Sequence, residues 1–322
     1  MRVFVTGMGG EIGTRVARHL EADDKIDAIA GMDLEPPRRM LSRATYHYVD
    51  PQDRVKVSKV IHDFKPTVVV HMGIYEPHSR STPEQAEFRT EGGTAALLDA
   101  CRSVGTVEHL AVRSGLEVYG RRKGSSECPD ESAPVAPTTR FGTILAGVEA
   151  ATREAGADIG ASVFRLRCAP VTGAHLPSPL ARYLRMPLVP VPLPPAKQFS
   201  LVHVDDVAHA MYVAATLGLE DTLNLVAEDT INVYQALRRG KRLPLPVLGP
   251  TLRLTRMITE LLGSPLPDHT LELLTRGRMA TSRRAHEVLG FTPQHSTSSI
   301  INEIYDWSTK TYMGSEPTPS TP

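Results

Sequence analysis

The chain has 322 residues, which is enough for one large α/β domain with a smaller appended lobe. Its 36 basic and 36 acidic side chains cancel, so no broad electrostatic field favours a nucleic acid or an anionic membrane as a partner. The sequence has no run of about 18 apolar residues, so it predicts no membrane insertion. The three cysteines are far apart and form no CxxC pair, which suits free thiols in a reducing compartment. We therefore expect a cytoplasmic protein.

In the first half of the chain, short β-branched apolar runs alternate with longer helical patterns. The runs predict strands over residues 3–5, 26–32, 67–71, 109–113 and 160–167. The helical patterns cover residues 14–21, 55–64, 93–104 and 143–154. This alternation predicts an α/β fold with a doubly wound parallel sheet, right-handed crossovers and helices on both faces.

Beyond residue 167 the alternation stops and prolines cluster, over residues 187–195 and again over 244–250. Because proline lacks an amide hydrogen, we expect these segments to wrap a surface rather than to extend a sheet. The sequence predicts a larger domain over residues 1–167, to which residues 200–226 return. Residues 168–312 would form mainly a smaller mixed lobe with a helix near 252–262, and residues 313–322, rich in Ser, Thr and Pro, would be disordered.

Gly7, Gly10 and Gly13 follow the first predicted strand and open the first helix, which is the context that a dinucleotide-binding turn requires. Gly7 permits a tight turn, Gly10 lets the backbone approach a pyrophosphate, and Gly13 allows the helix to pack closely on the strand. The phosphates would lie at the positive N-terminus of the helix. The motif predicts a Rossmann domain that binds a dinucleotide.

Asp33 ends the second predicted strand, where a carboxylate accepts hydrogen bonds from both adenosine ribose hydroxyls and repels a 2′-phosphate. The sequence therefore favours NAD, with NADP as the less favoured option. Arg38 and Arg39 lie close behind and could reach a phosphate, although a solvated turn is the interpretation that we prefer. Asp50 either contacts adenine or caps the turn at Pro51.

The chain resembles the extended short-chain dehydrogenase/reductases, the family of NAD-dependent nucleotide-sugar epimerases and dehydratases. After the glycine loop, the matching segments are His71-Met72-Gly73, Gly93-Thr94, Val118-Tyr119-Gly120 and Val202–Ala208. The Asp205-Asp206 pair in the last segment has a structural alternative, as the cap of a helix over residues 209–215.

The resemblance implies a small lobe that binds substrate, a nucleotide-sugar-like small molecule as partner, and a homodimer formed by helices near residues 86–104 and 143–154. It also implies a set of residues that contact the cofactor. These are Gly7, Gly10, Glu11, Ile12, Gly13, Asp33, Leu34, Asp50, Pro51, Met72, Gly73, Tyr75 and Ser114.

Catalysis in this family resembles a Ser/Thr-Tyr-Lys relay, in which the tyrosine exchanges a proton with the alcohol oxygen while hydride moves. In this chain the three positions hold Gly115, Phe141 and Leu145, none of which titrates. Losing one positioned acid or base typically costs a factor of about 10² to 10⁴ in rate. The resemblance therefore implies a degenerate active site with no catalytic residue assigned.

Tyr119 and Lys123 match the Tyr-x-x-x-Lys spacing of the relay's tyrosine and lysine. We reject them because Tyr119 is predicted to end a strand and Gly120 to begin a loop, so the two side chains would not share a helix face. The candidate surrogates are Ser114 and Tyr75.

Other polar residues near these motifs have structural interpretations. Glu117 lies close to the relay positions, and Arg167 matches a structural arginine of the family. The asparagine that usually follows that arginine is replaced by Pro170. His203 has no partner at metal-ligand spacing, so no metal site is predicted.

Two functions remain open. The chain could bind NAD without turning it over, as the joint loss of tyrosine and lysine suggests. Alternatively, it could be an atypical NAD-dependent oxidoreductase or epimerase that acts on a nucleotide sugar or a similar polar substrate with surrogate acid/base residues, as the nearly complete family architecture suggests.

Overall fold

The computed structural model describes residues 1–322 except 174, 194–196, 249–264 and 312–322. The helix expected near residues 252–262 and the tail at 313–322 lie outside the described residues. None of the helices in the described part is long and apolar enough to cross a membrane.

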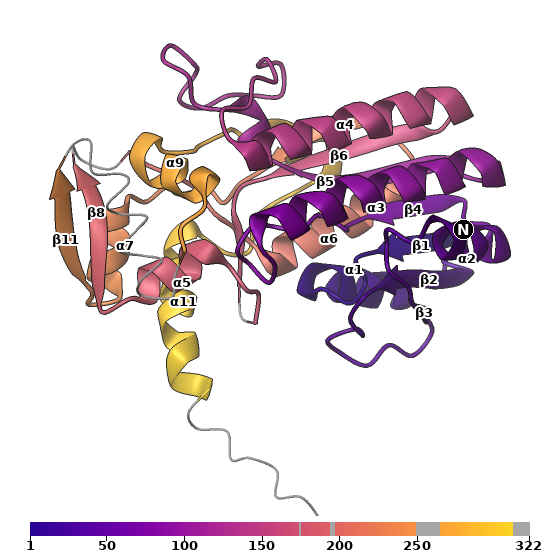
Figure 1. Cartoon of the computed structure of the whole chain (residues 1–322), viewed down its shortest axis with the longest axis horizontal. Helices are drawn as coiled ribbons and strands as arrows, with labels where there is room; N and C mark the ends of the chain where they lie inside the picture. The colour runs from indigo at the N-terminus through magenta and orange to yellow at the C-terminus, as the bar shows by residue number, and fades with distance from the viewer. Residues whose placement is uncertain (174, 194–196, 249–264, 312–322) are drawn as a thin grey trace, which may run out of the picture.

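A seven-stranded sheet with every strand parallel forms the centre of the larger part of the molecule (Figure 1). Its strands, in the order in which they lie side by side, are β10 (Asp221–Leu225), β6 (Ser162–Cys168), β5 (His109–Gly115), β4 (Val68–His71), β1 (Arg2–Thr6), β2 (Ala28–Asp33) and β3 (Thr45–Tyr48). The predicted Rossmann-like parallel sheet is thus confirmed.

Helices cover both faces of this sheet. On one face α1 packs against α6, and on the other α2, α3 and α4 lie side by side, with α3 and α4 in front of the sheet in Figure 1. The five helices are α1 (Glu11–Glu21), α2 (Arg54–Phe64), α3 (Pro83–Val104), α4 (Arg140–Ile159) and α6 (Val204–Leu217).

Helix α3 begins ten residues before the predicted start. Its first residues are marked by a capping motif and not by the apolar pattern on which the prediction was based. The Thr82 side chain accepts a hydrogen bond from the Gln85 N–H, the Gln85 side chain accepts one from the Thr82 N–H, and Pro83 occupies the first turn. Such a capping box fixes the first turn of a helix.

The smaller lobe has its own hydrophobic core, which includes Tyr183, Leu184, Phe199 and Ile300. Its elements are α5 (Pro179–Arg185), β8 (Leu188–Leu193), α7 (Val233–Arg239), β11 (Leu243–Leu248), α9 (Asp268–Arg276) and α11 (Thr297–Thr311). Three further elements, β7 (Val171–Thr172), β9 (Val202–His203) and α10 (Arg283–Leu289), contribute Val171, Val202 and Ala285 to the core of the larger domain. Strand β7 pairs with β9, and α10 packs against β10 and α6.

The expectation that the proline-rich segments wrap a surface rather than extend a sheet needs correction, because they form a small sheet of their own. Strands β8 and β11 pair in parallel, with Pro190 opposite Leu245 and Pro244 opposite Val189. In a two-stranded sheet both strands are edges. Prolines at alternate positions can therefore lie where the backbone nitrogen faces away from the partner strand and no hydrogen-bond donor is needed.

Two local expectations are also corrected. Tyr119 does not end a strand, because β5 stops at Gly115 and residues Leu116–Tyr119 form the short 3₁₀ helix η1. His203, rather than an aspartate, caps α6: its Nδ1 accepts a hydrogen bond from the Asp205 N–H. Asp206 instead accepts hydrogen bonds from the N–H groups of Gln294 and His295, which holds the C-terminal segment against α6.

Candidate functional site

A cavity of about 180 Å³ opens at the carboxyl ends of the central strands, beside the turn between β1 and α1. We call it the cofactor cavity. Its lining residues are Gly7, Gly10, Glu11, Ile12, Gly13, Asp33, Leu34, Glu35, Met72, Gly73, Ile74, Tyr75, Glu76, Ser79, Arg80, Ser81, Arg89, Arg113, Leu176 and Pro177.

The glycine turn has little room for side chains except at the position that would face a ligand. Gly7 has a φ of +67°, and a Cβ there would lie 2.9 Å from the Met72 backbone, while a Cβ at Gly13 would overlap the Gly7 carbonyl oxygen. At Gly10 the nearest atom to a Cβ is 3.4 Å away. Gly10 is the N-cap of α1 and has no side chain to cap it, so N–H groups of the first turn can receive an anion.

Asp33 lies at the end of β2, where its carboxylate accepts hydrogen bonds from the N–H groups of Gly9, at 3.0 Å, and Leu34, at 2.6 Å. Burial raises the pKa of Asp33, and these hydrogen bonds oppose the rise. The side chain is thereby fixed at the rim of the cofactor cavity, where its remaining lone pairs could accept hydrogen bonds from a diol.

Most of the residues predicted to contact the cofactor line this cavity, but three do not. Pro51 lines a smaller adjoining cavity together with Gly93. Asp50 is exposed, and its Oδ1 accepts a hydrogen bond from the Gln52 N–H at 3.0 Å, in agreement with a turn cap. Ser114 lines a separate cavity described below.

The motif around His71 is structural. Its Nδ1 lies 2.8 Å from Thr6 Oγ1, and its Nε2 lies 3.0 Å from Thr94 Oγ1. Burial lowers the pKa of His71 to about 4, so the ring is neutral. The two contacts of His71 therefore hold β1 and β4 against α3 beneath the cofactor cavity.

Several cationic residues of the cofactor cavity were not predicted. Arg80 pairs with Glu35, and Arg89 lies over the ring of Tyr75, with 5.9 Å between the guanidinium carbon and the ring centroid. Arg38 also pairs with Glu35. No sequence motif marks Arg80 and Arg89, because they lie in the connection before α3 and on α3 itself, far from the glycine loop in the chain.

Gly115, Phe141 and Leu145, which the family resemblance aligns with the relay, line one small cavity of about 30 Å³, which we call the relay cavity. Two residues, Glu76 and Arg113, line both this cavity and the cofactor cavity, so the two adjoin. The other lining residues are Ser114, Gly115, Glu117, Phe141, Leu145, Cys168, Ala169, Pro170 and Val171.

The space for a hydroxyl at position 115 is filled. A Cβ at Gly115 would overlap Glu117 Oε2 and lie 3.0 Å from Leu145 Cδ1. Glu117 is buried, and its Oε1 accepts a hydrogen bond from Arg278 Nη1 at 2.6 Å. The carboxylate of Glu117 thus occupies the place where a Ser or Thr side chain at this position would extend.

The candidate surrogate Ser114 takes part in a buried hydrogen-bond network. Its hydroxyl donates to Glu149 Oε1 at 2.6 Å, and Arg167 binds both oxygens of Glu149, at 2.9 and 2.7 Å. Arg167 Nη1 also donates to the Tyr119 hydroxyl at 2.9 Å. This buried network supports the structural interpretation of Arg167 and holds Tyr119 away from the exposed Lys123.

The other candidate surrogate, Tyr75, lines the cofactor cavity. Burial is the main cause that raises the pKa of Tyr75, and the charge of Asp33 adds to it. A general base at neutral pH needs the opposite shift. The hydroxyl of Tyr75 is therefore suited to donate a hydrogen bond rather than to exchange a proton.

A histidine and a carboxylate that the sequence analysis did not single out lie beside the relay cavity. His269 Nε2 is 3.1 Å from Glu76 Oε1, and the rings of His269 and Phe141 have their centroids 4.8 Å apart. Burial alone would lower the pKa of His269, but Asp268 and Glu76 outweigh it and raise the pKa to about 9. The arrangement is an ion pair beside Phe141, the residue that the family resemblance aligns with the relay tyrosine.

The described residues contain no group of three or more His, Cys, Asp or Glu side chains that could hold a metal ion.

Comparisons with known proteins agree with this geometry. A sequence model described as the NAD dependent epimerase/dehydratase family matches residues 3–225. An uncharacterized protein of Mycobacterium tuberculosis is 27% identical over 323 residues, which cover 94% of this chain and 83% of that protein. A dTDP-glucose 4,6-dehydratase of Neisseria meningitidis is 30% identical over 159 residues, 44% of each chain.

Solved structures share the fold at low identity. A UDP-glucose 4-epimerase of Thermotoga maritima, solved with UDP-glucose, has a TM-score of 0.74 and 19% identity, and the match covers 97% of this chain and all of that one. MoeE5, solved with UDP-glucose and NAD, has a TM-score of 0.74 and 20% identity over 97% of this chain and 100% of that one. With the family match over more than half of its length, the chain belongs to the NAD-dependent epimerase/dehydratase family.

Proposed function

We propose that this protein binds NAD in the cofactor cavity and does not carry out standard epimerase or dehydratase chemistry. The observation that carries the first part is the glycine turn, open at Gly10, with the Asp33 carboxylate fixed beside it. In this arrangement the N–H groups at the start of α1 bind the pyrophosphate and Asp33 binds the adenosine ribose. A 2′-phosphate would meet the charge of Asp33, so NAD is preferred to NADP.

The relay cavity supports the second part of the proposal. Phe141 and Leu145 offer no acid or base, and Glu117 fills the space beside Gly115. We further propose a functional division in which residues 1–167 and about 200–226 hold the cofactor and the remaining lobe contacts a nucleotide-sugar-like molecule. A cytoplasmic location and a homodimer belong to the same proposal.

A second candidate function is an atypical NAD-dependent oxidoreductase or epimerase, and the ion pair of Glu76 and His269 favours it. Glu76 lines both cavities, and its side chain remains 25% exposed although His269 is buried. When bound, NAD supplies a hydride acceptor. Glu76 would accept the hydroxyl proton of a substrate alcohol as the carbinol carbon loses hydride, and His269 would hold the carboxylate in place.

Calorimetry with NAD and NADP tests the proposed cofactor. The chain should bind NAD more tightly than NADP, and Asp33→Asn should weaken NAD binding at least tenfold, because the amide has no charge and only one accepting oxygen in place of two. Asp63→Asn, the same change at an exposed position on α2, is the control and should leave the affinity unchanged. Equal affinity of the wild type for the two nucleotides, or no effect of Asp33→Asn, contradicts the proposal.

Absorbance of the reduced cofactor distinguishes the two functions. NAD is mixed with the wild type and with UDP-glucose or dTDP-glucose as probes. Because an epimerase returns the hydride to the sugar and regenerates NAD, chromatography of the recovered sugar accompanies the absorbance measurement, and neither reduced cofactor nor an altered sugar supports binding without turnover. Reduction that is lost in Glu76→Gln and kept in the exposed control Glu84→Gln supports the second function, whereas loss in Tyr75→Phe or Ser114→Ala assigns the proton transfer to those residues.

A further inference from the structure

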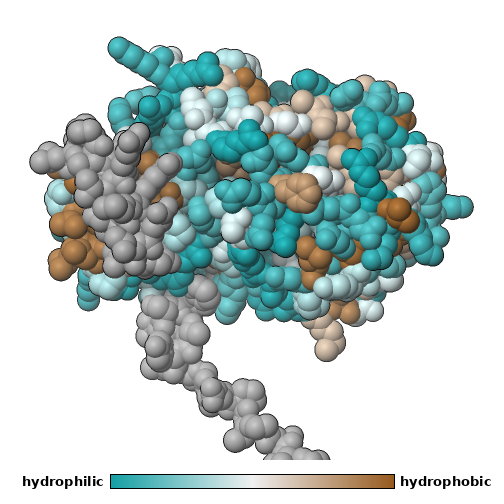
Figure 2. All heavy atoms as spheres, in the orientation of Figure 1, coloured by the Kyte–Doolittle hydropathy of each residue, from teal (hydrophilic) through white to brown (hydrophobic). Residues whose placement is uncertain are grey.

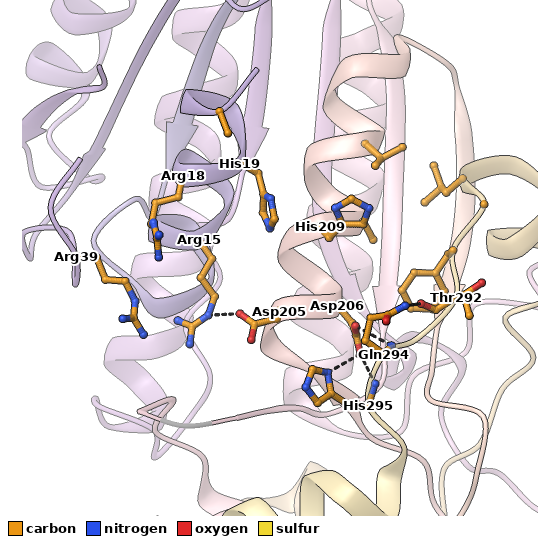
Figure 3. A pocket seen from close by; sticks show the side chains of 16 residues that line it. Arg15, Arg18, His19, Arg39, Asp205, Asp206, His209, Thr292, Gln294 and His295 are labelled. Carbon is orange, nitrogen blue, oxygen red and sulfur yellow. Dashed lines mark hydrogen bonds and ion pairs between the residues drawn. The ribbon is translucent and has the colours of Figure 1, made fainter. Parts of the chain in front are cut away.

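A second cavity, of about 810 Å³, lies between α1, α6 and residues 289–295 (Figure 3), and it shares no lining residue with the cofactor cavity. We call it the α1/α6 cavity. Its volume falls within the range of small-molecule sites, about 300 to 1,000 Å³. No step of the function proposed above uses it.

Two of the three arginines that line this cavity have no carboxylate partner among the described residues. Arg15 pairs with Glu11 and donates to Asp205 Oδ1 at 2.5 Å. Arg18 and Arg39, by contrast, form no ion pair within the described part of the chain, and Figure 3 shows both on the same side of the cavity as Arg15.

The carboxylates of the cavity are already occupied. Asp205 pairs with Arg15, and Asp206 accepts hydrogen bonds from the backbone N–H groups of Gln294, at 3.0 Å, and His295, at 3.3 Å. Three arginines against two carboxylates leave the lining with one net positive charge, and Arg18 and Arg39 have no carboxylate partner among the described residues, so the cavity is suited to an anion. Planar guanidinium groups bind phosphate oxygens through paired hydrogen bonds.

The remaining wall offers hydrogen-bond donors and apolar surface. His19 on α1 and His209 on α6 face each other in Figure 3, with 5.4 Å between their ring centroids. Apolar residues line the rest of the wall. These are Ala22, Ala210, Val213, Leu289 and Phe291. A ligand that fits both parts has an anionic group and an apolar or planar body.

We propose that the α1/α6 cavity is a binding site for a small phosphate-bearing molecule, separate from the cofactor cavity. Arg18 and Arg39 bind the phosphate, the two histidines donate further hydrogen bonds, and the apolar wall receives the body of the ligand. The proposal does not depend on NAD binding in the cofactor cavity.

Calorimetric titration of the full chain with sodium pyrophosphate, in the presence of NAD, tests this site. The wild type should bind one equivalent. The double variant Arg18→Gln/Arg39→Gln should bind at least tenfold more weakly, because two charge-assisted contacts are lost. The control is Arg54→Gln/Arg122→Gln, which removes the same charge from two exposed positions outside the cavity and should match the wild type.

A parallel titration with AMP and with inorganic phosphate tests the apolar wall. AMP should bind the wild type more tightly than inorganic phosphate does, and it should lose affinity in Arg18→Gln/Arg39→Gln. Absence of binding of pyrophosphate and AMP, or equal affinity of the two double variants for pyrophosphate, overturns the proposal. Circular dichroism confirms that each variant is folded before it is titrated.

Discussion

At the scale of single residues, two buried arginines organise the acids around the relay cavity. Arg278 donates to Glu117 at 2.6 Å and to Glu272 at 3.0 Å, and Arg167 binds both oxygens of Glu149. Removing one partner of a buried pair leaves an unpaired charge, which typically costs about 3 to 5 kcal/mol. Glu117 is therefore held firmly in the space beside Gly115, where a Cβ would meet its carboxylate.

This crowding predicts that Gly115→Ala destabilises the protein by about 1 to 3 kcal/mol, the usual cost of overpacking. Gly147→Ala is the matched control, because a Cβ at Gly147 meets no atom within 4 Å. In that exposed helical position the same substitution should stabilise the protein by about 0.5 to 1 kcal/mol. Urea unfolding measures both variants. If Gly115→Ala is as stable as the wild type, the space beside Glu117 is larger than described.

His269 predicts a pH dependence of stability. Its folded-state pKa of about 9 lies above the ordinary value of 6.5, because Asp268 and Glu76 outweigh the effect of burial. A raised pKa stabilises the fold fully below pH 6.5, and this contribution is lost as the pH rises through 9. Unfolding free energies measured between pH 6.5 and 9 should therefore fall less steeply in His269→Gln than in the wild type, whereas the control His62→Gln should keep the wild-type slope. Equal slopes in all three proteins would refute this.

At the scale of elements, helix α1 reaches from one cavity to the other. Its first residue, Glu11, lines the cofactor cavity, and one turn later Arg15 lines the α1/α6 cavity. Arg15 pairs with Glu11 and with Asp205 on α6. An anion in the α1/α6 cavity would attract Arg15 away from Glu11. The carboxylate of Glu11 would then repel the pyrophosphate group of NAD at the start of α1.

The helix therefore predicts that pyrophosphate weakens NAD binding, by about fivefold, at the low end of typical couplings between sites. Calorimetry of NAD with and without pyrophosphate measures the effect, and by linkage NAD must weaken pyrophosphate binding by the same factor. If pyrophosphate competes directly with NAD for the glycine turn, it should weaken NAD binding equally in the Arg18→Gln/Arg39→Gln variant. If the effect passes through α1, pyrophosphate should leave the NAD affinity of that variant unchanged. An NAD affinity independent of pyrophosphate rules the coupling out.

The elements also show what the sequence could and could not predict. The parallel sheet and the glycine turn were predictable because their signals are local: an apolar run, a turn and a helix follow one another in the chain. The pair of Glu76 and His269 was not, because only tertiary packing brings α9 against a loop residue that lies 193 positions earlier in the chain. Strands β8 and β11 were missed because the rule against proline in sheets weakens at an edge.

At the scale of the whole molecule, α3 and α4 lie side by side on one face of the sheet, and Arg140 of α4 donates to Glu87 of α3 at 2.9 Å. Phe88 of α3 is 68% exposed. On the face drawn in Figure 2, hydrophobic side chains form separate patches among hydrophilic ones. An exposed aromatic ring on the helix pair that we propose as the dimer interface is a natural anchor for a second copy.

The proposed homodimer predicts that Phe88→Glu shifts the protein toward the monomer, because a charge would be buried without a partner at the interface. Sedimentation velocity of the wild type should give a dimer, and Phe88→Glu should raise its dissociation constant at least tenfold. Val55→Glu places the same charge on α2 at another exposed apolar position, 79% exposed, and should remain dimeric. A wild type that sediments as a monomer at every concentration contradicts the dimer itself, whereas a dimer that tolerates Phe88→Glu places its interface on another face.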